Sequence, residues 1–252
     1  MTLSLAIITF NEQYNIIKLL DSIADIANEI IIVDSYSTDN TKLVCKRYPN
    51  VKFFERKFSG YGEQKNYALS LCNSEWVLFL DADEIPDNDL KGSILNVILS
   101  NNSSFNVYKL KLDNYLGNHL LRFGGWGNVY RERFFRRKFA KFSDDIVHEF
   151  LITNQKVGTL SGKINHYTYK NIHHHILKIN TYSEMMVEKM IENGKSSSKI
   201  KIILAPMYEF VKVYFFKLGF LDGFLGFYVA KTISYYTFLK YTKLYEKLRL
   251  IR

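Results

Sequence analysis

The sequence predicts an α/β protein whose central sheet is mostly parallel. Short apolar runs typical of strands alternate with segments typical of helices through the first 80 or so residues, and three of the strands end in polar or acidic residues. Strands joined by helices pair in parallel, and ligands bind at the carboxyl ends of such strands. With 252 residues and 47% hydrophobic content, the chain can bury a full core.

Each element follows from its local pattern. Unbroken apolar runs bounded by polar residues indicate buried strands, and apolar residues that recur every three or four positions indicate helices. We predict strands at residues 3–10, 29–34, 51–55, 76–81 and 105–112. We predict helices at residues 12–26, 39–48, 61–72 and 88–100. Beyond Pro86 the pattern loosens, and a Gly- and Arg-rich stretch reaches residue 141.

The charge distribution separates a catalytic domain, expected at residues 1–165, from a helical tail at 166–252. Residues 199–252 hold ten Lys/Arg and three Asp/Glu, a net charge of +7, and residues 1–198 carry the other +2. Spaced lysines among Phe and Tyr are typical of helices that lie on an anionic membrane surface. A helical subdomain packed on the core or on a second subunit is the alternative, as is a re-entrant or crossing helix at 218–239.

The amino terminus lacks the basic segment and apolar length of a secretory signal. We therefore expect a cytoplasmic protein, peripheral on the inner face of the cytoplasmic membrane. Cys45 and Cys72 fall in predicted helices without metal-ligand spacing, so we expect them to be reduced and structural.

Two carboxylates follow the apolar run 76–80, in Asp81-Ala82-Asp83. Acids one residue apart can hold Mg²⁺ or Mn²⁺ and leave coordination positions for the phosphates of a nucleotide. A solvated turn is the alternative. The first strand ends in Phe10-Asn11-Glu12 and the second in Asp34-Ser35, and carboxylates that converge there need a cation or hydrogen-bond donors. The glycine-rich loops of dinucleotide and ATP sites are absent from the sequence.

Three motifs together resemble the glycosyltransferases of family 2, which have the GT-A fold: Ile-Ile-Thr-Phe-Asn-Glu at 7–12, Val-Asp-Ser-Tyr-Ser-Thr-Asp-Asn-Thr at 33–41, and Leu-Asp-Ala-Asp-Glu at 80–84. Motifs at 60–66, 124–126, 134–137, 142–145, 147–149 and 217–223 are similar to the bacterial branch that builds the lipopolysaccharide core, including its β-1,4-glucosyltransferases. Tyr36 and Asn40 stand where the family usually has glycine. Asn tolerates a left-handed backbone and Tyr does so poorly, so we expect unusual loop geometry at Tyr36.

The resemblance implies a Rossmann-like nucleotide-diphospho-sugar transferase domain with a C-terminal amphipathic tail. It implies that Glu12 and Asp34 line the nucleoside pocket and that Lys65 lies near the donor diphosphate. Asp83 is then the metal ligand, with Asp81 near the ribose or the metal waters. The residues assigned to the donor are Phe10, Glu12, Asp34, Lys65, Asp81, Ala82, Arg136 and Arg137. Mg²⁺ or Mn²⁺ is the expected cofactor.

Inverting sugar transfer needs a general base on the acceptor hydroxyl. Glu149 is the preferred candidate and Asp145 the second, because this acidic cluster matches the family's acceptor-side acid. A helix cap formed by residues 143–145 is the alternative. Trp126, whose ring could stack on a sugar or pack in the core, and His148 are assigned to the acceptor.

The run Arg131, Arg133, Arg136, Arg137, Lys138 and Lys141 is interleaved with Phe134 and Phe135. We assign Arg136 and Arg137 to phosphate binding and the other cations to the surface, although the alternation could also mark a strand with one buried face. The run His173-His174-His175 lacks ligand spacing, and His166 is expected to be packed or hydrogen-bonded.

The sequence thus predicts an inverting, metal-dependent transferase that moves a hexose, expected from UDP-glucose, onto a heptose of a lipid-linked saccharide. The alternatives are a polyprenyl-phosphate sugar synthase or another surface-polysaccharide transferase of the same fold. A non-enzymatic alternative is a basic module that binds nucleotides or nucleic acid, although no nucleic-acid partner is expected.

Overall fold

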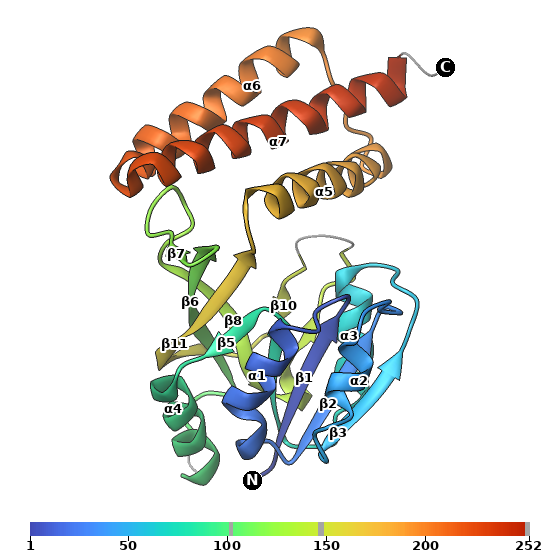
Figure 1. Cartoon of the computed structure of the whole chain (residues 1–252), viewed down its shortest axis with the longest axis vertical. Helices are drawn as coiled ribbons and strands as arrows, with labels where there is room; N and C mark the ends of the chain where they lie inside the picture. The colour runs from blue at the N-terminus through green and yellow to red at the C-terminus, as the bar shows by residue number, and fades with distance from the viewer. Residues whose placement is uncertain (101–102, 146–148, 250–252) are drawn as a thin grey trace. The chain divides into compact units, whose positions relative to one another are not determined.

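The computed structural model describes residues 1–100, 103–145 and 149–249, and its chain divides into two compact units (Figure 1). The first unit comprises Met1–Leu112 and Tyr130–His166, and the second comprises Asp113–Val129 and Tyr167–Arg252. The first unit ends close to residue 165, where the sequence placed the end of the catalytic domain. Residues 113–129, which the sequence assigned to that domain, belong instead to the second unit.

Among the described residues, one sheet has the strand order β3-β2-β1-β4-β8-β6-β11-β5, with β7 (His119–Leu120) paired to β6. Its first half consists of β1 (Leu3–Thr9), β2 (Glu29–Asp34), β3 (Val51–Glu55) and β4 (Trp76–Asp81). The rest consists of β5 (Glu84–Pro86), β6 (Val107–Leu116), β8 (Val129–Arg136) and β11 (Val157–Tyr169). The first four strands are parallel to one another, and β8 joins β4 antiparallel. The strand order reverses beside β1, which is where doubly wound sheets bind ligands.

The predicted elements of the first half are present, with differences at their ends. The bounds of β2, β3 and β4 agree with the prediction. The helix expected at 12–26 is α1 (Asn15–Ile23) followed by the 3₁₀ turn η1 (Ala24–Ile26), and the helix expected at 39–48 shortens to α2 (Thr41–Cys45). The helices α3 (Tyr61–Leu71) and α4 (Asn88–Leu99) are close to their predicted ranges. The strand expected at 105–112 is β6, which extends to Leu116.

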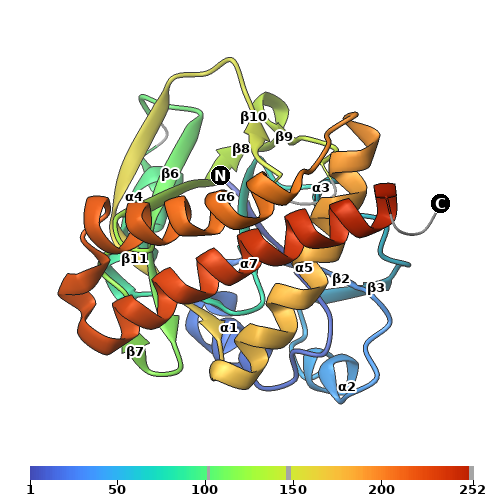
Figure 2. The same cartoon turned by 90° about the horizontal axis from the view of Figure 1, so that it is seen from above.

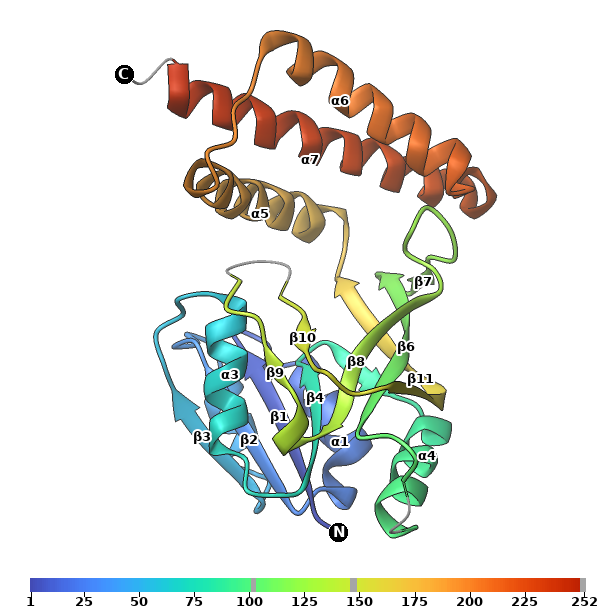
Figure 3. The same ribbon diagram turned by 180° about the vertical axis from the view of Figure 1, so that it is seen from behind.

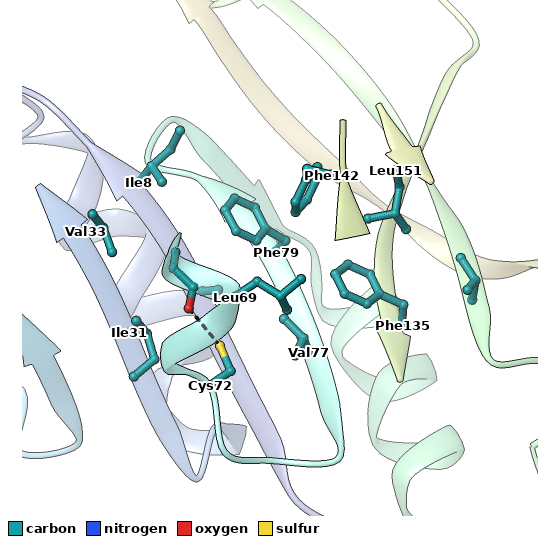
Figure 4. Close-up of a cluster of buried hydrophobic side chains, with 13 residues drawn as sticks. Ile8, Ile31, Val33, Leu69, Cys72, Val77, Phe79, Phe135, Phe142 and Leu151 are labelled. Atoms are coloured by element: carbon teal, nitrogen blue, oxygen red, sulfur yellow. Dashed lines mark hydrogen bonds between the residues drawn. The ribbon is translucent and has the colours of Figure 1, made fainter. Parts of the chain in front are cut away.

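The first unit has a core on each face of the parallel strands because side chains alternate along each strand. One face carries Ala6, Ile8 and Val33 and packs against α3 and the hairpin of β9 (Lys141–Phe142) and β10 (Leu151–Ile152) (Figures 3 and 4). The helix α1 covers the other face with its apolar side (Figure 1). Both cysteines are free and buried, as predicted, and burial raises the pKa of each thiol to about 12.

The second unit consists mainly of α5 (Ile172–Glu192), α6 (Lys199–Val211) and α7 (Gly223–Arg249), with the π-helical turn η3 (Lys212–Phe216) and the 3₁₀ turn η4 (Gly219–Asp222) between the last two. The helices α6 and α7 lie side by side, and α5 packs on α7 (Figure 2). Within the described residues, no single helix is long and apolar enough to cross a membrane. Only the segments Lys199–Phe216 and Gly219–Arg249 taken together, which are bent by 71°, reach that length and composition.

A buried carboxylate connects three strands at the amino-terminal edge of the sheet. The Glu29 carboxylate accepts hydrogen bonds from Ser4 Oγ (2.6 Å) and from the backbone N–H of Asn73 (2.6 Å), and it pairs with Lys52 (2.8 Å). Burial opposes the charged form, but these donors outweigh burial and lower the pKa of Glu29 from 4.5 to about 2. A carboxyl group whose pKa is lowered on folding stabilises the native state above its unfolded pKa.

We therefore predict that Glu29→Gln lowers the free energy of unfolding at pH 7 by about 2 kcal/mol. In the wild type this contribution is present above pH 4.5 and disappears as the pH falls towards about 2. Denaturant unfolding between pH 7 and pH 3 measures both effects, and the variant should lose less stability than the wild type on acidification. Glu55→Gln is the matched control, because Glu55 also pairs with a lysine (Lys42, 2.6 Å) but is exposed. Glu55→Gln should lower the free energy of unfolding by less than about 1 kcal/mol.

Candidate active site

Three parallel strands end at one edge of the sheet, where the sequence-predicted donor residues Phe10, Asp34 and Asp81 lie. Thr9 of β1 is level with Asp34 of β2, and Ile8 of β1 is level with Asp81 of β4. Adjacent strands lie about 4.8 Å apart, so the residues that follow Thr9, Asp34 and Asp81 are neighbours. The loop that carries Phe10 and Glu12 therefore begins beside Asp34.

The loops after β1 and β2 are held to each other by the Asp34 carboxylate. It accepts hydrogen bonds from the N–H (2.6 Å) and the Oγ (2.5 Å) of Ser37, and Ser37 Oγ accepts one from Asn11 N (2.7 Å). Asp34 is 1% exposed, and burial raises its pKa although both Ser37 bonds favour the charged form. Glu12 is fixed in the same way, because its N–H donates to Thr41 Oγ1 (2.9 Å) and its carboxylate accepts from Asn15 (2.7 Å).

Tyr36 keeps the left-handed backbone that its loop requires, with a φ of 62°. This is the unusual geometry that the sequence predicted at a position where the family usually has glycine. Asn40 has a negative φ of −80° and is not left-handed. The rings of Phe10 and Tyr36 are 55% and 57% exposed beside this loop, so both present aromatic surface at the strand ends. Aromatic faces of this kind can stack on a nucleobase.

Arg133 of β8 lies buried between two carboxylates at the end of β4. Its Nη2 lies 2.7 Å from Asp81 Oδ2 and 2.8 Å from Glu84 Oε1, and the residue is 8% exposed. Burial opposes the charge of Asp81, but Arg133 and Lys65 outweigh burial and hold the pKa of Asp81 well below its usual range. Burial raises the pKa of Glu84. Arg133 Nε is buried and has no hydrogen-bond partner among the described residues.

Lys65 of α3 connects Asp81 to the candidate base. Its Nζ lies 3.0 Å from Asp81 Oδ1 and 2.7 Å from Glu149 Oε1, and its side chain is 2% exposed. The rings of Phe79 and Phe142 flank the ammonium at 5.2 and 5.6 Å from their centroids. A cation held in this way beside two acids is well placed to meet an incoming phosphate.

Asp83 and His166 form a second polar pair, with Asp83 Oδ1 3.6 Å from His166 Nε2. Across the described part of the chain, no group of three or more His, Cys, Asp and Glu side chains is arranged to hold a metal. Mg²⁺ in nucleotide enzymes is commonly held by one or two carboxylates together with substrate phosphates, and Mn²⁺ also accepts nitrogen. The pair therefore fits an ion whose coordination is completed by a diphosphate. His166 was expected to be packed or hydrogen-bonded, and its nearness to Asp83 could not be predicted because the two residues are 83 positions apart and only the pairing of β11 with β5 brings them close.

The structure corrects the assignment of the basic run. Arg136 pairs with Glu75, and Arg137 donates its N–H to the carbonyl of Glu75, at the start of β4. Trp76 is level with Arg136, so these arginines lie about 16 Å along the strand from Asp81. Arg133, which the sequence assigned to the surface, is the arginine at the candidate site. The run is a strand with Arg133, Phe134 and Phe135 all buried.

The other residues that the sequence assigned to the site lie in different parts of the chain. Glu149 lies in the Lys65 cluster, whereas the Asp145 carboxylate accepts from Ser143 Oγ (2.9 Å) and its carbonyl accepts from Gly62 N (3.1 Å). The helix cap expected at 143–145 is wrong, because the described residues between β9 and β10 contain no helix, and Asp145 instead makes these contacts within a loop. Ala82 is buried between the two acids, and His148 falls outside the described residues. Trp126 packs in the second unit with Tyr169 and His175, as the core alternative predicted.

The comparison with known proteins agrees with this geometry. The model of the family "Glycosyl transferase family 2" matches residues 4–158, more than half of the chain, and the chain belongs to that family. It is a glycosyltransferase with the GT-A fold. It is 31% identical over 97% of its length to an uncharacterised glycosyltransferase of Rickettsia typhi, of which the match covers 87%. It is 30% identical over 98% of its length to the lipopolysaccharide core biosynthesis glycosyltransferase LpsC of Rhizobium meliloti, of which 93% is covered.

Two solved structures are similar at lower identity. TarS of S. aureus (residues 1–349) aligns with 100% of this chain and 92% of its own, with a TM-score of 0.49 and 16% identity. The glucosyl-3-phosphoglycerate synthase of Mycobacterium tuberculosis, solved with Mn²⁺, UDP and phosphoglyceric acid, aligns with 45% of this chain and 43% of its own, with a TM-score of 0.37 and 22% identity.

The left-handed backbone of Tyr36 leads to a stability prediction. We expect Tyr36→Gly to raise the free energy of unfolding by about 0.5 to 1 kcal/mol, because relief of backbone strain exceeds the entropy that glycine adds to the unfolded chain. Tyr14→Gly is the control, since Tyr14 is also exposed but has an ordinary φ of −90°. It should be destabilising. Denaturant unfolding measures the free energy of unfolding of both variants. A loss of stability in Tyr36→Gly would contradict the prediction that the backbone at Tyr36 is strained.

Proposed function

We propose that this enzyme moves a hexose, with glucose from UDP-glucose as the expected donor, onto a heptose of the lipopolysaccharide inner core with inversion at the sugar carbon. The reaction is proposed to take place at the inner face of the cytoplasmic membrane, on a lipid-linked acceptor. The observation that carries the chemistry is the position of Lys65 Nζ, which lies within 3.0 Å of Asp81 and 2.7 Å of Glu149. The proposed phosphate-binding cation, Lys65, thus lies between the donor-side acid Asp81 and the candidate base Glu149 at the end of β4.

The donor nucleoside is proposed to lie against the loops after β1 and β2. Asp34 and Glu12 offer carboxylate oxygens to the donor groups of a uracil or a ribose, and the exposed Phe10 ring offers a stacking face. Asp34 is already fixed by Ser37, so little ordering remains when a nucleoside binds.

The diphosphate is proposed to lie between Lys65 and the Asp83–His166 pair. A divalent ion held there would neutralise charge on the departing nucleoside diphosphate. Lys65 supplies a cation on the opposite side, and the orphaned Nε of Arg133 is a further buried donor next to Asp81. Asp81 ends β4 and Ala82 follows it, so these two residues set the position of Asp83 relative to these cations.

Glu149 is proposed as the general base. Its carboxylate takes the proton of the acceptor hydroxyl while that oxygen forms a bond to the anomeric carbon. The bond from this carbon to the diphosphate oxygen breaks on the opposite face, which inverts the configuration, and the nucleoside diphosphate leaves with the electron pair. Glu149 pairs with Lys65, so arrival of the diphosphate, which attracts Lys65, would release the carboxylate for this role.

The acceptor class rests on likeness to LpsC, which is named for lipopolysaccharide core biosynthesis. A polyprenyl-phosphate sugar synthase of the same fold would use the same donor residues and differ in its acceptor. Membership of the glycosyltransferase family removes the non-enzymatic alternative.

The proposal predicts metal-dependent release of UDP that rises when the acceptor is added. UDP-, GDP- and dTDP-sugars are each incubated with Mg²⁺, Mn²⁺ or EDTA, with and without a truncated core that ends in heptose, and the released nucleotide is quantified. Turnover with polyprenyl phosphate and not with the heptose-ended core would show that the enzyme is a polyprenyl-phosphate sugar synthase. Equal turnover in EDTA would remove the metal from the mechanism.

Two substitutions separate donor binding from transfer. We expect Asp83→Ala to lower turnover by about 10³-fold or more because it removes a metal ligand. Glu149→Gln should lower kcat by about 10² to 10⁴-fold and leave the Kd for UDP within a few-fold of wild type. Asp89→Asn on the exposed first turn of α4 is the control for loss of a carboxylate. Calorimetric UDP binding and product release are measured on all three variants, and full transfer by Glu149→Gln would exclude Glu149 as the base.

A further inference from the structure

One face of α6 presents large apolar side chains to solvent. Ile200 (70%), Ile203 (61%), Leu204 (56%) and Met207 (60%) are exposed, as are Tyr208 (62%) and Val211 (40%). They recur every three or four residues and therefore form one stripe. The opposite side of α6 packs on α7, so the stripe is the side that its neighbour leaves uncovered (Figure 2). A stripe of this size on a helix surface marks an interaction site.

The turn between the two helices extends this stripe. Its exposed side chains are Phe215, Phe216, Leu218, Phe220, Leu221 and Phe224. Phe216 and Phe224 are the most exposed, at 77% and 73%. The turn is closely packed, because a Cβ atom on Gly226 would lie 1.7 Å from the carbonyl oxygen of Gly219. The 71° bend therefore presents a fixed apolar tip.

Two of the charged residues that interrupt the apolar stretch, Asp222 and Lys231, are bound within the second unit, whereas Lys217 is exposed. The Asp222 carboxylate accepts hydrogen bonds from the backbone N–H groups of Arg122 (2.9 Å) and Phe123 (2.8 Å). Lys231 lies over the rings of Phe210 and Phe227, at 5.0 and 5.8 Å from their centroids. An acid that is already hydrogen-bonded and a lysine that extends along aromatic surface do not prevent burial of the apolar tip, and the long side chain of Lys217 can keep its ammonium at the headgroups.

We propose that α6, α7 and the turn between them form a docking surface for an anionic lipid bilayer, with residues 215–224 inserted deepest. The net charge of +7 over residues 199–252 matches anionic headgroups, whereas it would repel a second copy of the same face. A spanning orientation would place Lys231, in the first third of α7, within the hydrocarbon, so the pair lies in the interface plane. This inference rests on the proposed function only for the idea of a lipid-linked acceptor.

The test measures vesicle binding of the full chain without any sugar donor, so its failure is distinct from failure of the transferase assay. The chain is floated with vesicles of phosphatidylcholine and with vesicles that also contain about 30% phosphatidylglycerol. We expect binding to the anionic vesicles that weakens with salt. Phe216→Ser combined with Phe224→Ser should lower the partition coefficient at least about tenfold. The matched control is Leu43→Ser with Leu99→Ser, two leucines of the first unit that are 60% and 74% exposed, and it should bind as the wild type does.

A probe on the turn tests insertion directly. Both natural cysteines are buried, so Phe224→Cys or Leu99→Cys can be labelled selectively with an environment-sensitive fluorophore. Anionic vesicles should shift the emission of the probe at 224 to the blue and leave the probe at 99 unchanged. The proposal is overturned if the wild type binds no vesicles, if the double serine variant binds equally well, or if the probe at 224 does not respond. Self-association that the serine variant abolishes, without lipid binding, would assign the face to a second copy instead.

Discussion

The buried guanidinium of Arg133 fixes the end of β4, and the candidate active site is organised around it. One nitrogen lies within 2.8 Å of both Asp81 and Glu84, and the Asp81 N–H donates to the Glu84 carboxylate (3.0 Å). Buried charges are tolerated only when they are paired and hydrogen-bonded. Loss of Arg133 would leave the buried Glu84 without its guanidinium partner and Asp81 with Lys65 as its remaining ion-pair partner. The pairing of β8 with β4 therefore supplies the cation that compensates these acids.

The same cluster explains how one site can serve two reactants. Lys65 stands between Asp81, on the donor side, and Glu149, the candidate base. Without a donor the ammonium compensates both acids. In the proposed mechanism, a diphosphate carries more negative charge than either carboxylate and would compete for Lys65, which would loosen its hold on Glu149. Donor binding and activation of the proposed base would then be coupled through this one cation.

The sequence predicted the elements whose signals are local. Strands β2, β3 and β4 have the predicted bounds because short runs rich in apolar residues, bounded by polar ones, define a strand, and the acids at their ends identified the candidate site. The parallel pairing of β1 to β4 was predicted, but the register and the pairing of the later strands could not be. Arg133 and Arg136 look alike in the charge run, and only the register of β8 on β4 places one beside Asp81 and the other beside Glu75. The nearness of His166 to Asp83 could not be predicted for the same reason, and residues 113–129 join the second unit through partners about 100 residues away.

Hydrogen bonds to residues 122–124 explain the structural role of the tail motif at 217–223. Asp222 of the turn accepts from the N–H groups of Arg122 and Phe123, and Gly124 N donates to the carbonyl of Lys217 (2.9 Å). The motifs at 124–126 and 217–223, which are far apart in sequence, therefore form one junction that holds the bend. The segment that holds the bend runs directly into β8, and Arg133 follows four residues after Val129. A single stretch of chain thus carries the contacts of the proposed lipid-binding turn and, four residues beyond Val129, the arginine that lies beside Asp81 and Glu84.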